Sequence, residues 1–271
     1  MKFSIITVNY NNREGLIKTI ESVINQSYTD YEYIIIDGGS NDGSAEVIKE
    51  YSDRITYWAS ERDNGVYNAM NKGIAQAKGT YINFMNSGDT FYTHNTLEKV
   101  STHMDESDFV VGKDYNQDPD TGEVFTTILP TRISMAALYM WTLPHQSAFI
   151  RRALFNESPY DETLHIVADW KFYLDKIVYE GKTVQLLDMI ICNREQEGMS
   201  ISQASKTVEE RHRVLSTLLP PGILKDYETL ASLDRSTLYK LLNLLDKKKS
   251  RRWISLFVKV LTRLYQSRSE L

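Results

Sequence analysis

The strongest constraint on the fold is a pattern in which short apolar runs alternate with segments of helical spacing. Each run is rich in β-branched and aromatic residues, and turn residues or helix caps follow it. The expected strands are Phe3–Val8, Tyr31–Ile36, Ile55–Trp58 and Tyr81–Met85, and the expected helices are Leu16–Ile24, Ala45–Tyr51 and Val66–Ala77. Such alternation predicts an α/β fold, with a mainly parallel sheet flanked by helices.

Polar residues gather where these expected strands end. Parallel sheets bind ligands in the crevice beyond the carboxyl ends of their strands. We therefore expect one crevice to collect residues that are far apart in the chain, namely Thr7, Asn9, Asp37, Asp63 and Asp89.

The alternation weakens beyond about residue 105. We expect a strand at Val124–Leu129, an amphipathic helix at Asp169–Tyr179 and a loop at Glu195–Ser202. Two further helices are expected at Ser236–Leu245 and Trp253–Tyr265. The predicted organisation is one catalytic-type domain over residues 1–215 and a helical C-terminal extension over residues 216–271.

The glycine-rich turn DGGSNDGS does not match the common phosphate-binding loops. Gly38, Gly39 and Gly43 lack the spacing of a dinucleotide fingerprint, and Ser44 stands where a Walker loop requires lysine. A carboxylate at Asp37 repels phosphate but accepts hydrogen bonds well. It therefore suits an N–H group of a base such as uracil.

The segment NSGD, from Asn86 to Asp89, follows the fourth expected strand. A carboxylate here approaches phosphate favourably only if a divalent cation lies between them. Mn²⁺ and Mg²⁺ accept one or two carboxylates together with substrate phosphates. We therefore expect Asp89 to hold such a metal. The single cysteine, Cys192, excludes a multi-cysteine zinc site and a disulfide framework.

Charge is distributed unevenly. Residues 247–271 contain eight basic residues and one acidic residue, a net of +7; the chain totals −5, so residues 1–246 carry −12. An acidic body argues against nucleic acid as a partner. The basic segment is open to two interpretations: a helix packed on its own domain, or a peripheral membrane contact. Lacking a signal-peptide pattern or a long apolar run, the sequence predicts a cytoplasmic location, with the inner membrane face as an option.

Five sequence pieces, in order, resemble the family-2 glycosyltransferases, which are inverting enzymes with the GT-A fold. The pieces are SIITVNYNN, IIIDGGSNDGS, SERDNGVYNAMNKGIAQAKGTYINFMNSGD, HQSAFIRR and ADWKFYLDKI. The resemblance covers roughly the first 200 residues. It implies transfer of a sugar from a nucleotide diphosphate-sugar, with a uridine donor favoured and guanosine or deoxythymidine donors left open. It also implies a saccharide or lipid-linked acceptor, in the assembly of a surface polysaccharide or glycolipid.

The resemblance assigns roles residue by residue. It implies Asp169 as the general base, Asp89 as the metal ligand, and His145 and Gln146 beside the acceptor or donor sugar. Ser200 would lie in a flexible segment closing over the diphosphate. The residues implied to contact the nucleotide-sugar are Thr7, Asn9, Tyr10, Asp37, Asp63, Lys72, Asn86 and Ser87.

The sequence departs from the family pattern in two places. Asn86 and Gly88 stand where further acids are usual in the metal motif, and Ala168 replaces the first member of the acidic pair. These departures leave open a non-catalytic nucleotide-sugar-binding module of the same fold. A nucleotidyltransferase is disfavoured because SIITVNYNN has neither the glycine nor the lysine of a triphosphate loop. Simpler interpretations also remain: Asp37 as a turn residue, His145 as a buried histidine and Asp169 as an exposed helix charge.

Overall fold

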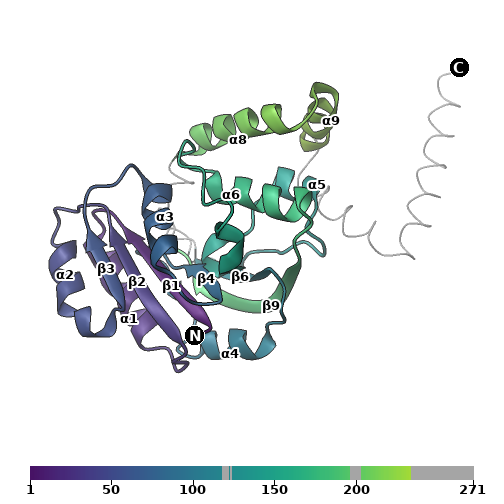
Figure 1. Ribbon diagram of the computed structural model, residues 1–271. Coiled ribbons are helices and arrows are strands. Elements are labelled where there is room, and N and C mark those ends of the chain that lie inside the picture. Colours follow the sequence, from purple (N-terminus) through teal and green to yellow (C-terminus); the bar gives the residue numbers. More distant parts are fainter. Residues whose placement is uncertain (118–121, 123, 196–202, 233–271) are drawn as a thin grey trace, which may run out of the picture. The chain divides into compact units, whose positions relative to one another are not determined.

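A computed structural model describes residues 1–117, 122, 124–195 and 203–232 (Figure 1). The chain forms two compact units. The first comprises Met1–Leu129 and Thr142–Leu215, and the second comprises Pro130–Trp141 and the residues from Ser216 onward. Each unit is described separately below.

A mixed β-sheet forms the centre of the first unit. Its strands lie in the order β3-β2-β1-β4-β8-β6-β9-β5, with β7 paired to β6. The half β3-β2-β1-β4 is parallel, and β6 also runs parallel to β9. The strand bounds are β1 Phe3–Asn9, β2 Tyr31–Asp37, β3 Tyr57–Ser60, β4 Tyr81–Phe84, β5 Thr90–Phe91, β6 Phe109–Gln117, β7 Val124–Thr126, β8 Ala148–Arg151 and β9 Val184–Asn193.

Helices cover both faces of this sheet. Those of the first unit are α1 Arg13–Ile24, α2 Ser44–Glu50, α3 Val66–Gln76, α4 Thr96–His103, α6 Ala168–Tyr173 and most of α8 Ala204–Leu218. A π-helical stretch, Leu174–Tyr179, continues α6. Short 3₁₀ turns occupy Ser52–Arg54, His145–Ser147 and Arg152–Phe155. The predicted α/β class with a mixed sheet and flanking helices is confirmed.

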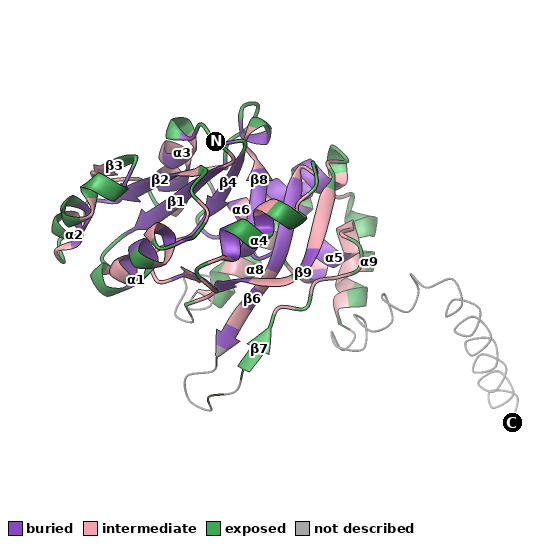
Figure 2. Ribbon diagram, turned by 90° about the horizontal axis from the view of Figure 1, so that it is seen from below, coloured by how far each residue is buried: buried purple, intermediate pink, exposed green. Residues whose placement is uncertain are grey.

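The two faces of β1 pack against different helices. Phe3 and Ile5 belong to a core cluster that also contains Leu16 and Ile20 of α1. Ile6 points to the other face, where it meets α3. Every residue of β1 is buried, as a strand covered on both sides requires (Figure 2).

Helix α3 packs unusually close to the sheet at Gly73. A Cβ at this position would lie 2.6 Å from Cγ2 of Ile6 and 3.6 Å from Cγ1 of Ile36. Real side-chain atoms do not approach that closely, so only glycine permits this spacing. The close approach at Gly73 therefore sets the distance of α3 from β1 and β2 at this point.

Some predicted boundaries shift. The third strand lies at Tyr57–Ser60 rather than Ile55–Trp58, because the chain before it forms a 3₁₀ turn and Ile55 is buried ahead of the strand. The strand expected at Val124–Leu129 ends at Thr126. The helix expected at Asp169–Tyr179 starts at Ala168 and changes to π geometry at Leu174. The helices predicted beyond residue 235 lie outside the described residues.

The described part of the second unit pairs two helices, α5 Met135–Met140 and α9 Pro221–Ala231. The rings of Tyr139 and Tyr227 stack, with centroids 5.0 Å apart. Pro220 and Pro221 begin α9, where a missing N–H group carries no penalty.

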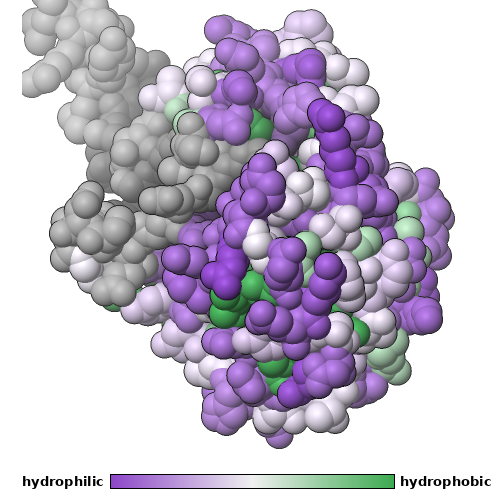
Figure 3. All heavy atoms as spheres, turned by 90° about the vertical axis from the view of Figure 1, so that its left-hand side faces the viewer, coloured by the Kyte–Doolittle hydropathy of each residue, from purple (hydrophilic) through white to green (hydrophobic). Residues whose placement is uncertain are grey.

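The sheet edge at β3 and the neighbouring helix α2 lie on a face that is mainly hydrophilic, with scattered hydrophobic side chains (Figure 3). β3 itself is only four residues long, and its Tyr57 is 39 % exposed. A short edge strand among polar side chains is poorly suited to pairing with another chain. Within the described residues, every helix is too short or too polar to cross a membrane.

Candidate active site

The carboxyl ends of β1 and β2 place Asn9 beside Asp37. The two residues are register partners, and Asn9 Nδ2 donates to Asp37 Oδ1 at 2.7 Å. The Ser40 and Ser60 hydroxyls donate to the two oxygens of the same carboxylate, each at 2.6 Å. Burial opposes ionisation, but these donors outweigh it and lower the pKa of Asp37. Asp37 is therefore a fixed, ionised acceptor at the strand end.

Asp63 and Tyr10 lie next to this network. A Cβ at Gly38 would lie 2.6 Å from Asp63 Oδ2 and 3.2 Å from Tyr10 Cδ2. Asp63 Oδ1 accepts a bond from the Gly65 N–H at 2.9 Å, and the Tyr10 side chain is 68 % exposed. The loops after β1, β2 and β3 thus meet at one place, which we call the nucleotide-side cluster: Asn9, Tyr10, Asp37, Ser40, Ser60 and Asp63.

Two residues that the resemblance assigned to the donor have partners within the chain, and their contact with the donor stays a prediction. Thr7 is fully buried, and its hydroxyl donates to the Met85 carbonyl at 2.7 Å and lies 2.9 Å from the Tyr33 hydroxyl. Lys72 forms an ion pair with Glu61 at 2.7 Å. Thr7 therefore bonds to groups of the neighbouring chain segments in the interior of the fold, and Lys72 lies against Glu61.

The segment Asn86–Asp89 follows β4 and is fixed to helix α1. The Gly88 N–H donates to the Thr19 hydroxyl at 2.9 Å, and that hydroxyl lies 2.7 Å from the Asp89 carbonyl oxygen. Ser87 contributes its backbone, donating its N–H to the Val8 carbonyl at 3.1 Å. The turn requires a left-handed conformation at Gly88, whose φ is +101°.

Glu195 lies directly against this turn. A Cβ at Gly88 would come within 1.9 Å of Glu195 Oε2, and Asn12 Nδ2 donates to the same oxygen at 3.2 Å. The Glu195 N–H donates to Asp89 Oδ1 at 2.9 Å. Asp89 itself is 5 % exposed, and burial raises its pKa to about 6 despite that bond and the nearby His145. Two carboxylates therefore flank Gly88.

These residues fit the divalent cation that the resemblance implies. The Asn86 Oδ1 atom is buried and lacks a hydrogen-bond partner within the described part of the chain, so an oxygen ligand remains available beside Asp89. Among the described residues, no group of three or more His, Cys, Asp or Glu side chains could hold a metal by itself. Such an ion would therefore share protein carboxylates with phosphate and water oxygens, as Mg²⁺ commonly does in nucleotide sites.

Asp169, in the first turn of α6, meets His145 and Tyr67. Asp169 Oδ2 lies 3.4 Å from His145 Nδ1, and Asp169 Oδ1 accepts the Tyr67 hydroxyl at 2.8 Å. The side chain of Asp169 is only 15 % exposed, which excludes the interpretation as a solvated helix charge. His145 Nε2 lies 3.1 Å from Asn86 Nδ2, so the pair reaches the Asn86–Asp89 segment. We call this group the catalytic-side cluster; it also includes Glu195 and the Asp114 carboxylate that lies near His145. Its members are Asp169, His145, Tyr67, Asn86, Asp89, Asp114 and Glu195.

The pKa shifts of this pair oppose one another. Burial favours neutral forms of both groups. For Asp169 the hydrogen bond and charge of His145, aided by Tyr67, outweigh burial and lower its pKa. For His145 the carboxylates of Asp169, Asp89 and Asp114 outweigh burial and raise its pKa. The arrangement keeps Asp169 ionised, as a proton acceptor must be.

Two buried groups support His145 from the adjacent elements. Asp114 of β6 is 1 % exposed and accepts the Ser147 hydroxyl at 2.5 Å, and burial raises its pKa. Gln146 is 8 % exposed, and its backbone carbonyl accepts from Asn83 Nδ2 at 2.8 Å. The 3₁₀ turn His145–Ser147 is thus fixed to both β4 and β6.

The structure therefore brings most of the sequence-predicted residues into two clusters. Tyr67, Asp114 and Glu195 take part in them although the sequence did not single them out. Tyr67 lies within one of the five sequence pieces, but its partner Asp169 is distant in the chain. Asp114 and Glu195 carry no local signal, since their partners are distant in the chain. Ser200 lies outside the described residues.

The model of the family described as glycosyl transferase family 2 matches residues 4–179. The chain belongs to this family. The match spans β1 to the end of the π-helical stretch, and so includes every cluster residue named above except Glu195.

Relatives with similar sequences are also described as glycosyltransferases. An uncharacterized glycosyltransferase of Mycobacterium tuberculosis is 30 % identical over 210 residues, covering 72 % of this chain and 76 % of the relative. A PGL/p-HBAD biosynthesis glycosyltransferase of Mycobacterium bovis is 30 % identical over 179 residues, covering 63 % of this chain and 67 % of the relative.

Two solved structures share the fold. Staphylococcus aureus TarS 1–349 in complex with UDP-GlcNAc superposes with a TM-score of 0.61 at 20 % identity, over 75 % of this chain and 61 % of TarS 1–349. A mannosyltransferase from Pyrobaculum calidifontis in complex with GDP-Man and Mn²⁺ also gives 0.61, at 13 % identity, over 96 % of this chain and 80 % of that one. The fold is accordingly GT-A-like, and this chain spans less than two thirds of the TarS fragment.

Proposed function

We propose that this glycosyltransferase moves a sugar from a uridine diphosphate-sugar to a hydroxyl of a saccharide or lipid-linked acceptor, with inversion at the anomeric carbon. The observation that carries the proposal is the buried Asp169–His145 pair, joined through Asn86 to the segment that ends in Asp89. Residues 1–215 would form the catalytic domain and residues 216–271 a helical extension. Assembly of a surface polysaccharide or glycolipid is the expected context.

The nucleotide-side cluster supports uridine as the base. Asp37 is held ionised by three side-chain donors and can accept the N–H of a uracil ring. The exposed Tyr10 ring beside Gly38 offers a flat surface for stacking. The UDP-GlcNAc complex of the fold neighbour TarS is in line with this donor class.

The Asn86–Asp89 segment would receive the diphosphate. Asp89 and Glu195 are the residues that would hold Mn²⁺ or Mg²⁺, and the Mn²⁺ complex of the mannosyltransferase neighbour supports such an ion. The metal, when bound, supplies positive charge that stabilises the leaving diphosphate. The raised pKa of Asp89 reflects burial without a cation, and a bound ion would favour its charged form.

Asp169 would act as the general base. Its carboxylate takes the proton of the acceptor hydroxyl while that oxygen forms a bond to the anomeric carbon. The bond from that carbon to the diphosphate oxygen breaks on the opposite face, and the electron pair leaves with the diphosphate. A single displacement of this kind inverts the configuration. His145 and Tyr67 would orient the carboxylate through their bonds to its two oxygens.

Calorimetric titration of uridine diphosphate, with and without Mn²⁺, tests the donor assignment. We expect binding that strengthens when the metal is present. Binding of guanosine diphosphate in preference to uridine diphosphate would overturn the choice of base, and failure of every nucleoside diphosphate would overturn the donor site. Release of uridine diphosphate from a UDP-sugar would then separate an enzyme from a non-catalytic binding module of the same fold.

The basic segment near the C-terminus supports a second, separable proposal about location. Its net of +7 over residues 247–271 suits anionic lipid at the inner face of a membrane. Flotation of the full chain with liposomes containing phosphatidylserine tests this contact. Binding that is lost at high salt would support it, and protein that stays at the bottom of the gradient would contradict it.

A further inference from the structure

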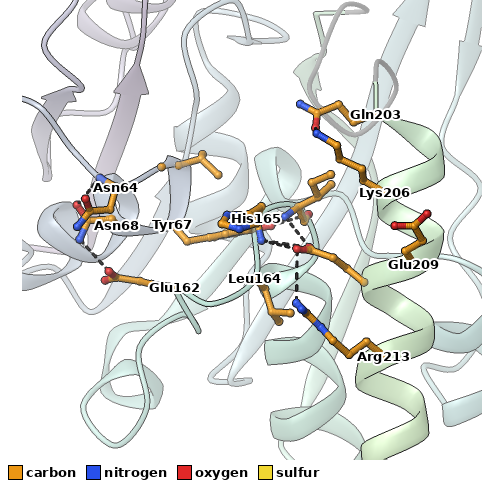
Figure 4. A pocket seen from close by; sticks show the side chains of 14 residues that line it. Asn64, Tyr67, Asn68, Glu162, Leu164, His165, Gln203, Lys206, Glu209 and Arg213 are labelled. Carbon is orange, nitrogen blue, oxygen red and sulfur yellow. Dashed lines mark hydrogen bonds and ion pairs between the residues drawn. The ribbon is translucent and has the colours of Figure 1, made fainter.

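A cavity of about 590 Å³ opens in the first unit, between the N-terminal end of α3, the segment before α6, and α8. Ligand pockets in proteins commonly measure about 300–1,000 Å³, so a small ligand would fit. None of the roles assigned above uses this cavity. Figure 4 shows its walls, with Asn64, Tyr67 and Asn68 on one side and the α8 residues opposite.

One face of α8 forms the far wall. Lys206, Glu209, Glu210 and Arg213 all line the cavity, at the spacing of successive turns on one side of a helix. Val208, which points to the opposite side by the same periodicity, is 68 % exposed. The helix thus presents a polar face to the cavity and a solvated face away from it.

The carboxylate of Glu210 fixes this wall to the segment that precedes Asp169. Glu210 is 9 % exposed and accepts the His165 N–H at 2.9 Å and the Ile166 N–H at 2.9 Å. Arg211 lies over the ring of Trp170, 4.4 Å from its centroid. Helix α8 is therefore anchored on both sides of the turn that carries the proposed base.

The lining is polar but nearly balanced in charge. It contains three carboxylates, two cationic side chains and His165, with three amide side chains among the remainder. Two of the carboxylates are already occupied: Glu210 by the backbone bonds above, and Glu162 by the amides of Asn68 and Asn71, each at 2.8 Å. Amide and charged groups of both signs can exchange hydrogen bonds with hydroxyl groups, whereas an acyl chain would leave them unsatisfied. The wall chemistry therefore suits a neutral, hydroxyl-rich ligand.

Tyr67 separates the cavity from Asp169 by one side chain. It lines the cavity, and its hydroxyl bonds to Asp169 and to the Ile166 carbonyl at 2.8 and 2.7 Å. A ligand in the cavity would therefore lie beside Asp169 and not directly on it. It would instead hold a neighbouring part of the same molecule in position to reach the carboxylate.

We propose that this cavity binds a neutral saccharide unit of the acceptor, adjacent to the unit whose hydroxyl reacts at Asp169. The inference rests on the proposed function and specifies the acceptor class for that site. It predicts an acceptor that extends at least one sugar beyond the reacting position.

Saturation-transfer NMR with small glycosides tests the proposal. The probes are the methyl glycosides of glucose, galactose, mannose and N-acetylglucosamine, with methyl glucuronide as an anionic comparison and uridine diphosphate in every sample. The variant Lys206→Trp fills the cavity, and Val208→Trp places the same bulk on the exposed face of the same helix. Asn64→Ala removes an amide from the opposite wall.

We expect at least one neutral glycoside to be saturated in the wild type and in Val208→Trp, and its affinity to fall by about tenfold in Lys206→Trp. Asn64→Ala should weaken it by a smaller factor, and the uridine diphosphate signal should stay constant throughout. Glycoside signals that are absent in the wild type, unchanged in Lys206→Trp, or strongest for the glucuronide would each overturn the proposal. Loss of the uridine diphosphate signal in the wild type would instead contradict the donor assignment, and so the two failures are distinguishable.

Discussion

The two clusters at the carboxyl edge of the sheet are built in different ways. The nucleotide-side cluster surrounds one carboxylate, Asp37, with uncharged donors, and the groups come from loops that follow consecutive parallel strands. The catalytic-side cluster couples Asp169, His145, Asp89 and Asp114 through space. The first is suited to presenting a fixed hydrogen-bond acceptor to the nucleobase of the proposed donor. The second is suited to moving a proton, because each charge there depends on its neighbours.

The largest expected effect comes from removing the proposed base. Asp169→Asn should lower the transfer rate by about 10²–10⁴-fold, because proton removal by a positioned group contributes that much. Donor affinity should stay near the wild-type value. Steady-state kinetics together with calorimetry of uridine diphosphate measure both quantities. Asp175→Asn, which alters a carboxylate farther along the same helical segment, serves as the control. A near-normal rate in Asp169→Asn would remove the functional distinction between the clusters.

Asp37→Asn tests the other cluster. A hydrogen bond to a charged group contributes about 1.5–3 kcal/mol, so uridine diphosphate should bind roughly 10–150-fold more weakly. The catalytic rate at saturating donor should change far less. Asp42→Asn provides a matched control, because Asp42 lies in the same turn and accepts from Arg13 and Ser44, yet is exposed and outside the cluster. Equal weakening in both variants would show that only the turn, and not the acceptor, matters.

Gly88→Ala tests whether Glu195 takes part in metal binding. The new Cβ would occupy the place of Glu195 Oε2, and the left-handed backbone adds about 1–2 kcal/mol of strain. We expect the Mn²⁺ concentration for half-maximal activity to rise several-fold. Gly181→Ala carries similar strain, with φ +70°, but meets no atom within 4 Å. If both variants showed the same Mn²⁺ dependence, Glu195 would have no part in metal binding.

His145→Ala should produce the smallest change at neutral pH and a shift in the pH profile. His145 lowers the pKa of Asp169, so its removal raises that pKa. Since the base must be ionised, the acidic limb of the rate profile should move to higher pH. Profiles of kcat/KM from acid to neutral pH, with the exposed His94→Ala as control, measure this shift. An acidic limb that stays in place would mean that the pair does not titrate as a unit.

The same contrast explains what the sequence could predict. Asn9, Asp37 and Asp63 follow buried parallel strands, so a local pattern and one topological rule were enough to bring them together. The catalytic side depends on contacts that join distant residues, such as Tyr67 with Asp169 and Asp89 with Glu195. The spacing of apolar residues along the sequence does not indicate such long-range pairs. His145 and Asp169 were reached only through the family resemblance, and Asp114 and Glu195 were missed.

Thr7 and Lys72 show what a sequence motif leaves open. Their places in a motif predict contact with the donor, and this stays a prediction, but the motif does not report which partners the side chains have in the fold. The pleat of β1 turns Thr7 into the interior, and helix α3 turns Lys72 toward Glu61. Position in the sequence located the strand end correctly, while side-chain orientation depended on the packed structure.

The close packing at Gly73 makes helix α3 a spacer between the two clusters. Asp63 lies just before this helix and Tyr67 in its first turn, so one rigid element sets the separation of the two clusters. A side chain at position 73 would clash with Ile6 and press the helix away from the sheet. The distance between the two clusters thus depends on a core residue that belongs to neither of them.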